Sequence, residues 1–170
     1  MDAYEAIFKR HCVRSYEDRA VPDDAIERML NAAVAAPSAG NLQSWRFVVV
    51  KDPGLKEDLA GAAGQRFVSR CSHLIVVCAD LETAESRYGR RGRELYCLQD
   101  TAAAMQNLFL AATVEGLAAC WVGAFDEGEV ARVLGLPSRF RPVAMMPVGY
   151  PGRMGERRPR RPLGEVVEWR

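Results

Sequence analysis

Residues 35–50 read AAPSAGNLQSWRFVVV, a stretch that leads from an apolar helical pattern into an apolar run typical of a buried strand. Connecting a helix to a strand needs only a stop signal and a turn, and Pro37 and Gly40 can supply both. The loop nevertheless carries three more hydrogen-bonding side chains, those of Ser38, Asn41 and Gln43. Chain connection alone leaves this excess unexplained, so the loop is a candidate functional segment.

The flanking segments show clear helix and strand patterns. Before the loop, apolar residues recur every three or four positions and predict a helix that begins near Asp23. After it, residues 45–50 and 74–79 are short β-branched runs that predict two buried strands, with a helix from about Leu55 between them. A short N-terminal helix is expected to end in the basic cluster at residues 9–11, where cations suit a helix C-terminus.

The second half of the chain continues the alternation. Residues 95–117 are apolar on more than one side, which predicts a helix buried in the core or, as we favour, against a second subunit. Strands are expected at 119–124 and 142–150, on either side of a helix opened at Asp126. Pro147 is expected to place part of the last strand at a sheet edge or bulge.

Length and composition limit the classes of protein to which this chain can belong. With 170 residues and 49% hydrophobic content, we expect one domain, residues 1–170, that buries roughly 70% of its unfolded surface. The net charge of +1 argues against a nucleic-acid binder. The five cysteines form no CxxC pair and the two histidines have no zinc-ligand spacing, so we expect no metal site and reduced thiols. Without a signal-peptide pattern or a run of about 20 apolar residues, a cytoplasmic protein with no membrane segment is expected.

Three distant segments share residues suited to anions: RHCVR at 10–14, the loop at 37–43, and RPRRP at 158–162. Several arginines on different elements bind a phosphate far better than one does, because each planar guanidinium can donate two hydrogen bonds. Each cluster taken alone is more typical of a solvated surface. Their combination favours a shared anion site.

In chain order, the motifs RHCVRSYEDRAV, APSAGNLQSWRFVVV, LQDTAAAMQNLFLAATVEGLAACWVGAF, PVGYP and RPRRPL resemble the FMN-dependent nitroreductase family, over nearly the whole chain. The resemblance implies an α+β fold, a three-layer α/β/α sandwich with a mixed, mostly antiparallel central sheet. It also implies a homodimer with two FMN sites at the subunit interface and a C-terminal tail, residues 151–170, swapped onto the partner. The implied reaction is ping-pong transfer of reducing equivalents from NAD(P)H through FMN to a small-molecule acceptor, a nitroaromatic or a quinone.

The same resemblance assigns roles to the first basic segment and to the loop. It implies that Arg10, His11 and Cys12 contact the FMN phosphate and ribityl chain. Arg14 falls near the pyrimidine end of the ring, where a guanidinium stabilises the negative charge of the reduced flavin. The loop is expected to contact the flavin of the opposite subunit through the backbone near Pro37 and the side chains of Ser38, Asn41 and Gln43.

Later segments complete the implied site. Arg158 and Arg160 are expected to close on the phosphate, and Gln65 to add a polar contact. The ring is expected to rest against Val122, Gly123 and Ala124, because a residue without a side chain lets the backbone approach closely. No catalytic side chain is required, since the cofactor carries the reaction.

The sequence departs from the family pattern at two positions and leaves other functions open. Cys12 replaces the usual serine, and Ser44 replaces the usual proline, which predicts a less rigid loop. The first alternative is another flavin reaction of the superfamily: reductive dehalogenation, heterocycle oxidation or flavin remodelling. The second is a non-enzymatic module whose arginine tail binds nucleic acid or an acidic partner.

Overall fold

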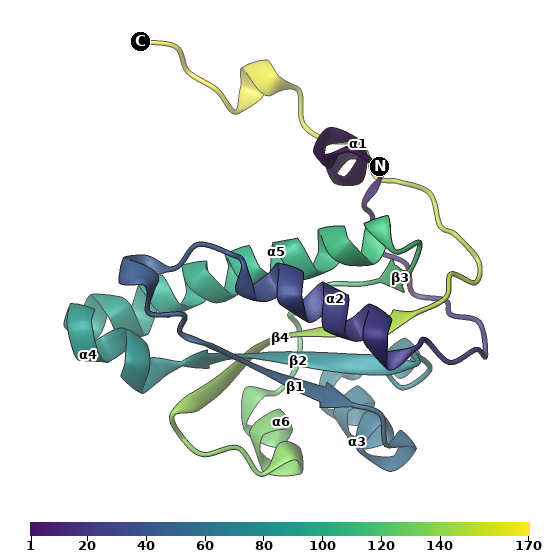
Figure 1. Ribbon diagram of the computed structural model, residues 1–170, viewed down its shortest axis with the longest axis horizontal. Helices are drawn as coiled ribbons and strands as arrows, with labels where there is room; N and C mark the ends of the chain where they lie inside the picture. Colours follow the sequence, from purple (N-terminus) through teal and green to yellow (C-terminus); the bar gives the residue numbers. More distant parts are fainter.

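The computed structural model describes residues 1–170 and has three layers, with helices on both faces of a central sheet (Figure 1). Helices α2 (Asp23–Val34) and α5 (Cys97–Val114) cover one face, and α3 (Pro53–Ala63) and α6 (Glu127–Leu134) cover the other. This is the α/β/α sandwich expected from the sequence, and all four helices lie where their patterns predict them.

The sheet contains four strands in the order β1-β2-β4-β3: β1 (Trp45–Val50), β2 (His73–Asp80), β4 (Phe140–Gly149) and β3 (Ala118–Ala119). Every pairing is antiparallel, so the mixed character expected of the sheet is not found. The connection between β1 and β2 explains their opposite directions. After β1 the chain passes through α3 and re-enters the sheet at the same end at which β1 finished. β2 therefore runs antiparallel to β1.

Apolar side chains fill both spaces between the layers. One buried cluster joins α2 and α5 to the sheet, and a second joins the opposite face to α3 and α6. All eight residues of β2 are buried, which fits its continuous apolar sequence. On α5, Met105, Leu108 and Phe109 are almost fully buried, and each such side chain contributes about 1.5–3 kcal/mol to folding.

One strand prediction needs correction and one is confirmed. The strand expected at 119–124 is only β3, followed by a single antiparallel bridge between Val122 and Met145 in β4. At Pro147, β4 has a strand partner only on its β2 side, because β3 pairs only with Val148 and Gly149, so this part of β4 lies at the expected sheet edge. The Pro147 carbonyl accepts a bond from the Tyr16 hydroxyl at 3.4 Å. The N and O of a strand residue point the same way, so the missing N–H faces a place where no strand pairs.

Helix α4 (Leu81–Arg91) was not expected, because its sequence is mostly polar and contains Gly89. A π-helical turn, Gly92–Tyr96, joins it to α5. A Cβ atom at Gly92 would lie 2.1 Å from the carbonyl oxygen of Ala84, so only glycine permits this approach of the two backbones.

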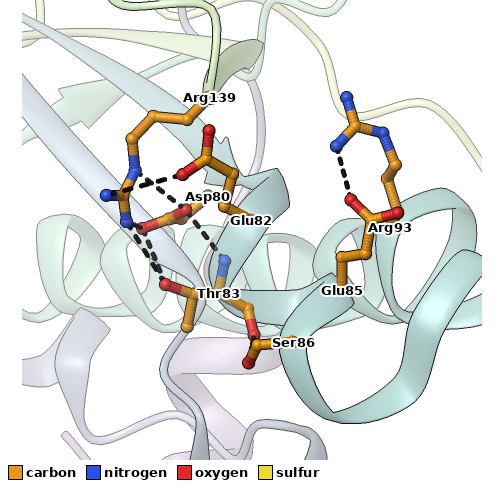
Figure 2. A network of polar contacts seen from close by, with 7 residues as sticks. All are labelled: Asp80, Glu82, Thr83, Glu85, Ser86, Arg93 and Arg139. Carbon is orange, nitrogen blue, oxygen red and sulfur yellow. Dashed lines mark hydrogen bonds and ion pairs between the residues drawn. The ribbon is translucent and has the colours of Figure 1, made fainter.

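A polar network fixes α4 to the sheet (Figure 2). Asp80, the last residue of β2, accepts a hydrogen bond from the Thr83 N–H at 3.2 Å and pairs with Arg139. Burial raises the pKa of Asp80, but Arg139 and Thr83 outweigh it, so the pKa is lowered overall. A separate ion pair joins Arg93 in the π-turn to Glu85 at 2.8 Å.

Both ends of the chain project from the sandwich (Figure 1). Helix α1 (Ala3–Lys9) has one buried residue, Ala6, and the tail after Pro151 extends past it. The tail exposes large apolar side chains, including Leu163 and Trp169, the latter 89% exposed. None of the helices has the length and apolar character to cross a membrane.

Candidate functional site

The segment after α1 is fixed to the edge of the sheet by a backbone hydrogen bond. The N–H of Val13 donates to the carbonyl of Ala119 at 2.9 Å, and the Val13 side chain is buried. The guanidinium of Arg10 lies 4.8 Å from the centre of the Phe109 ring, and that of Arg14 lies 5.8 Å from the centre of another aromatic ring. Such cation–π contacts orient a guanidinium without neutralising its charge.

Two basic segments that are far apart in the sequence meet at one cavity of about 270 Å³, which we call the basic cavity. It is lined by Arg10, His11, Cys12, Arg14, Glu156, Arg157, Arg158 and Arg160. None of its five arginines forms an ion pair with a carboxylate. Uncompensated guanidinium groups around one space suit a phosphate. The expected convergence of RHCVR with RPRRP is thus present within one chain.

Cys12 lies half-buried in the wall of this cavity, against the buried Cys120. The neighbouring Cys120 thiol, with smaller contributions from the N–H of Trp121 and the charges of Arg14 and Arg10, holds the pKa of Cys12 well below its ordinary value. These contributions outweigh burial, which acts in the opposite direction. The neighbouring Cys12 thiol, together with burial, raises the pKa of Cys120. Cys12 therefore ionises more readily than an ordinary cysteine.

The loop of residues 37–43, the amide loop, has an unusual backbone. Gly40, Asn41 and Gln43 have φ values of 57°, 56° and 52°, in the left-handed region. For the two residues with side chains this conformation costs roughly 1–2 kcal/mol each. The Ser38 hydroxyl accepts a hydrogen bond from the Gln43 N–H at 3.0 Å and so closes the loop on itself. Strain of this kind persists where the surroundings enforce it, and it is concentrated at functional sites.

Asp100, near the start of α5, anchors the amide loop. One of its carboxylate oxygens accepts a hydrogen bond from the Ala39 N–H at 2.9 Å, and the other accepts one from the Ser44 hydroxyl at 2.7 Å. Asp100 and Ser44 are both buried. The expectation that serine at position 44 loosens the loop is therefore wrong. Sequence reasoning missed Asp100, although it is the only charged residue between Leu95 and Val114.

Helix α4 packs against the same loop. A Cβ atom at Gly40 would lie 2.5 Å from the Tyr88 hydroxyl and 3.1 Å from a guanidinium nitrogen of Arg87. The positive φ favours glycine at this position, and a larger residue would also have to displace the ends of these two side chains. The unexpected helix helps to shape the amide loop.

The amide loop and the basic cavity do not meet within one chain. The loop is anchored to Asp100, whereas Arg10 lies over Phe109, nine positions further along α5, or about 13 Å at helical rise. In Figure 1 the loop after α2 lies beside α4, and the segment after α1 lies at the other end of α5.

Residues 122–124 lie just after β3 and Cys120 in the chain and are bridged to β4 at Val122. Val122 is held by two backbone hydrogen bonds with Met145, both 2.9 Å long. Gln65 donates from its side-chain amide to the carbonyl of Ala124 at 3.3 Å, so these two predicted site residues are neighbours. A Cβ atom at Gly123 would meet nothing closer than 3.9 Å, which leaves this backbone open to approach.

Comparison with known proteins gives the same relationship as the motifs. The family model described as "Nitroreductase family" matches residues 7–68 and 55–150. The chain belongs to the nitroreductase family. A protein of Thermus thermophilus named "NADH dehydrogenase" is 35% identical over all of this chain and 97% of its own length. A Bacillus subtilis protein named "FMN reductase (NADPH)" is 28% identical over 95% of this chain and 71% of its own length.

Solved structures give this nitroreductase-family protein the same fold. The structure of a nitroreductase family protein from Streptococcus pneumoniae superimposes with a TM-score of 0.91 at 26% identity. It covers 99% of this chain, and the match extends over 100% of that structure. The α+β nitroreductase fold expected from the motifs is therefore confirmed.

Proposed function

We propose that this protein is a cytoplasmic, homodimeric FMN-dependent oxidoreductase. It passes reducing equivalents from NAD(P)H through FMN to a nitroaromatic, a quinone or a related electron-poor acceptor. The observation that carries the proposal is the basic cavity, where two arginine-bearing segments at opposite ends of the chain converge. Membership of the nitroreductase family supports it, as do relatives named as NAD(P)H-dependent reductases.

The residues of the basic cavity fit the phosphate end of FMN. Arg10, Arg158 and Arg160 can donate charge-assisted hydrogen bonds to phosphate oxygens, each worth about 1.5–3 kcal/mol. The cavity of about 270 Å³ accommodates the phosphate and part of the ribityl chain, so the ring belongs outside it. The open backbone at Gly123 offers the ring a flat support.

The amide loop supplies the polar groups that the ring needs, but from a second subunit. Within one chain the loop is anchored at the other end of α5 from Arg10, so it would complete the site of a symmetry-related copy. In this arrangement the backbone at Pro37 and the side chains of Ser38, Asn41 and Gln43 contact the partner's flavin. Each dimer then contains two equivalent sites.

FMN, when bound, supplies the exchange of an electron pair between the nicotinamide and the acceptor. The protein contributes binding, orientation and electrostatic stabilisation. The guanidinium of Arg14, free of carboxylate partners, stabilises negative charge that develops beside it. His11 and Cys12 line the phosphate end, while Gln65 and residues 122–124 form the support on the other side.

The tail, residues 151–170, completes the proposed dimer as part of one FMN-binding domain that spans the chain. Three of its arginines, Arg157, Arg158 and Arg160, line the basic cavity, whereas its apolar side chains beyond Pro162 are exposed in their own chain. Burying Leu163, Val166, Val167 and Trp169 against the partner would remove this exposed apolar surface from water. The tail thus links cofactor binding to dimerisation.

A matched pair of variants tests the proposal. Arg158→Ala/Arg160→Ala removes two guanidinium groups from the basic cavity, whereas Arg161→Ala removes one that pairs with Glu165 outside it. In a fluorescence titration we expect the double variant to bind FMN at least about tenfold more weakly, which corresponds to 1.4 kcal/mol, and the control to bind normally. Equal affinities would refute the phosphate site.

Stopped-flow reduction by NADH and by NADPH, followed by reoxidation with a panel of acceptors, tests the reaction itself. Purified protein that is yellow, and whose flavin is reduced by either nucleotide, supports the oxidoreductase. A colourless protein that binds nucleic acid with steep salt dependence would instead support the non-enzymatic alternative.

A further inference from the structure

The segments that carry Cys12 and Cys120 lie side by side at the edge of the sheet. Val13 donates its N–H to the carbonyl of Ala119 at 2.9 Å. One residue back from Val13 and one residue on from Ala119, the side chains of Cys12 and Cys120 lie close enough for each thiol to shift the pKa of the other. A disulfide joins Cα atoms about 4.4–6.8 Å apart, a separation within reach of flanking positions on two hydrogen-bonded segments.

The two thiols differ in access and in charge. Cys12 is half-buried and lines the basic cavity, while Cys120 is 1% exposed and lies behind it. Arg10, Arg14 and the Trp121 N–H favour the thiolate at Cys12, and Cys120 keeps its proton. The arrangement therefore pairs an accessible, readily ionised thiol with a protected one.

We infer that Cys12 and Cys120 form a peroxide-sensitive dithiol, in which hydrogen peroxide oxidises Cys12 and Cys120 then closes a disulfide in the wall of the basic cavity. Cys12 is the attacking sulfur, and Cys120 is the resolving thiol. The disulfide does not depend on the proposed function. Protection of the pair by FMN does depend on it.

The chemistry balances in two steps. The Cys12 sulfur attacks one oxygen of hydrogen peroxide, the O–O bond breaks, and the departing hydroxide takes up a proton to become water. Cys12 is now a sulfenic acid, oxidised by two electrons, and the peroxide is reduced. The Cys120 sulfur then attacks the Cys12 sulfur, and the hydroxyl leaves as a second water with the Cys120 proton. In sum, two thiols and one peroxide yield one disulfide and two waters.

The remaining cysteines provide internal controls. Cys71, Cys78 and Cys97 are buried, and burial raises the pKa of all three, that of Cys71 to about 11 and that of Cys78 to about 12. Neutral buried thiols react slowly with peroxide. Oxidation is therefore expected to be confined to the pair at the cavity.

Intact mass and peptide mapping test the disulfide in the full-length protein treated with hydrogen peroxide. Trypsin cuts after Arg10 and Arg14, which places Cys12 on a four-residue peptide, but it leaves Cys97 and Cys120 together on residues 94–132. Fragmentation must therefore locate the bond. We expect a loss of two hydrogens in mass and a bond between Cys12 and Cys120. A bond to Cys97, or oxidation of Cys12 no faster than of Cys71, would overturn the inference.

Single variants separate the two roles. Cys120→Ser is expected to stop at the sulfenic acid, trapped by dimedone at Cys12, whereas Cys12→Ser is expected to leave Cys120 reduced. Cys78→Ser, a buried control, is expected to form the disulfide as the wild type does. Trapping at Cys120 in the Cys12→Ser variant would reverse the assignment and overturn it.

Oxidation with and without FMN separates this inference from the proposed function. A phosphate bound in the basic cavity would cover Cys12 and offset the charges of Arg10 and Arg14, so saturating FMN is expected to slow oxidation about tenfold or more. If FMN binds, measured by its fluorescence, and no disulfide ever forms in its absence, the inference fails. If the disulfide forms but FMN neither binds nor protects, the inference stands and the flavin site fails.

Discussion

The carboxylate of Asp100 accepts the backbone N–H of Ala39 at 2.9 Å, which ties the amide loop to the first turn of α5. Its second oxygen accepts from the Ser44 hydroxyl, so Asp100→Ala would leave the Ala39 N–H and the Ser44 hydroxyl without their acceptor. A buried group left without its partner costs about 1–3 kcal/mol, and we expect this loss in urea unfolding together with a lower flavin-to-protein ratio. Asp58→Ala, at an exposed position on α3, is the control. Identical unfolding midpoints for Asp100→Ala and wild type would contradict the anchor.

Backbone strain at Gln43 predicts opposite effects on stability and on flavin binding. Gln43→Gly removes the cost of a φ of 52° and is expected to raise the unfolding free energy by about 0.5–1 kcal/mol. The same change deletes the side chain proposed to contact the partner's flavin, so FMN should bind more weakly. Calorimetry and FMN titration measure the two effects. At Gln65, where φ is −134°, glycine should lower stability; a gain there would count against the strain argument.

The exposed end of the tail predicts a role in dimerisation. Trp169 is 89% exposed in its own chain, and burying it against a partner would contribute about 1.5–3 kcal/mol. Trp169→Ser should therefore weaken the dimer at least about tenfold in sedimentation experiments while leaving the arginines of the basic cavity in place. Arg170→Ala, which disturbs only an exposed pair with Glu168, serves as the control. A Trp169→Ser dimer as tight as the wild type would argue against a swapped tail.

The network around Asp80 predicts a specific acid sensitivity. Because the pKa of Asp80 is lowered in the folded state, its pairing with Arg139 stabilises the protein above the unfolded carboxyl pKa of about 3.9 and loses that effect as the pH falls further. Arg139→Gln should cost about 1 kcal/mol at pH 7, and the difference from wild type should shrink between about pH 4 and pH 2. Arg132→Gln, which breaks an exposed pair with Glu129, should cost less. A pH-independent difference would show that Arg139 acts by packing alone.

Periodicity and apolar runs were sufficient to predict most of the fold. The helix from Asp23 and the strands at 45–50 and 74–79 have continuous local signals, and the structure confirms each. Helix α4 was not predicted from the sequence. It is stabilised by the cap at Asp80 and by a close approach of two backbone segments that requires glycine at position 92. Neither feature leaves a hydrophobic pattern in the sequence.

The site was predictable in its parts but not in its arrangement. Composition identified the two basic segments, yet only the fold brings Arg14 and Arg158 to one cavity. The anchor at Asp100 depends on a hydrogen bond across 61 positions of sequence, which no local rule anticipates. The same holds for Cys12 and Cys120, since their contact arises from the edge of the sheet.

The distance along α5 between the amide loop and the basic cavity has a consequence for mixed assemblies. If each site takes its arginines from one chain and its loop from the other, defects in the two halves can complement each other between subunits. Refolding Arg158→Ala/Arg160→Ala chains together with Asn41→Ala chains would place half of all chains in mixed dimers, and about one site in four would then be intact. Recovery of tightly bound flavin, measured against each variant refolded alone, detects those sites. Two defective chains would thus rebuild one working site, which a site contained within a single chain never allows.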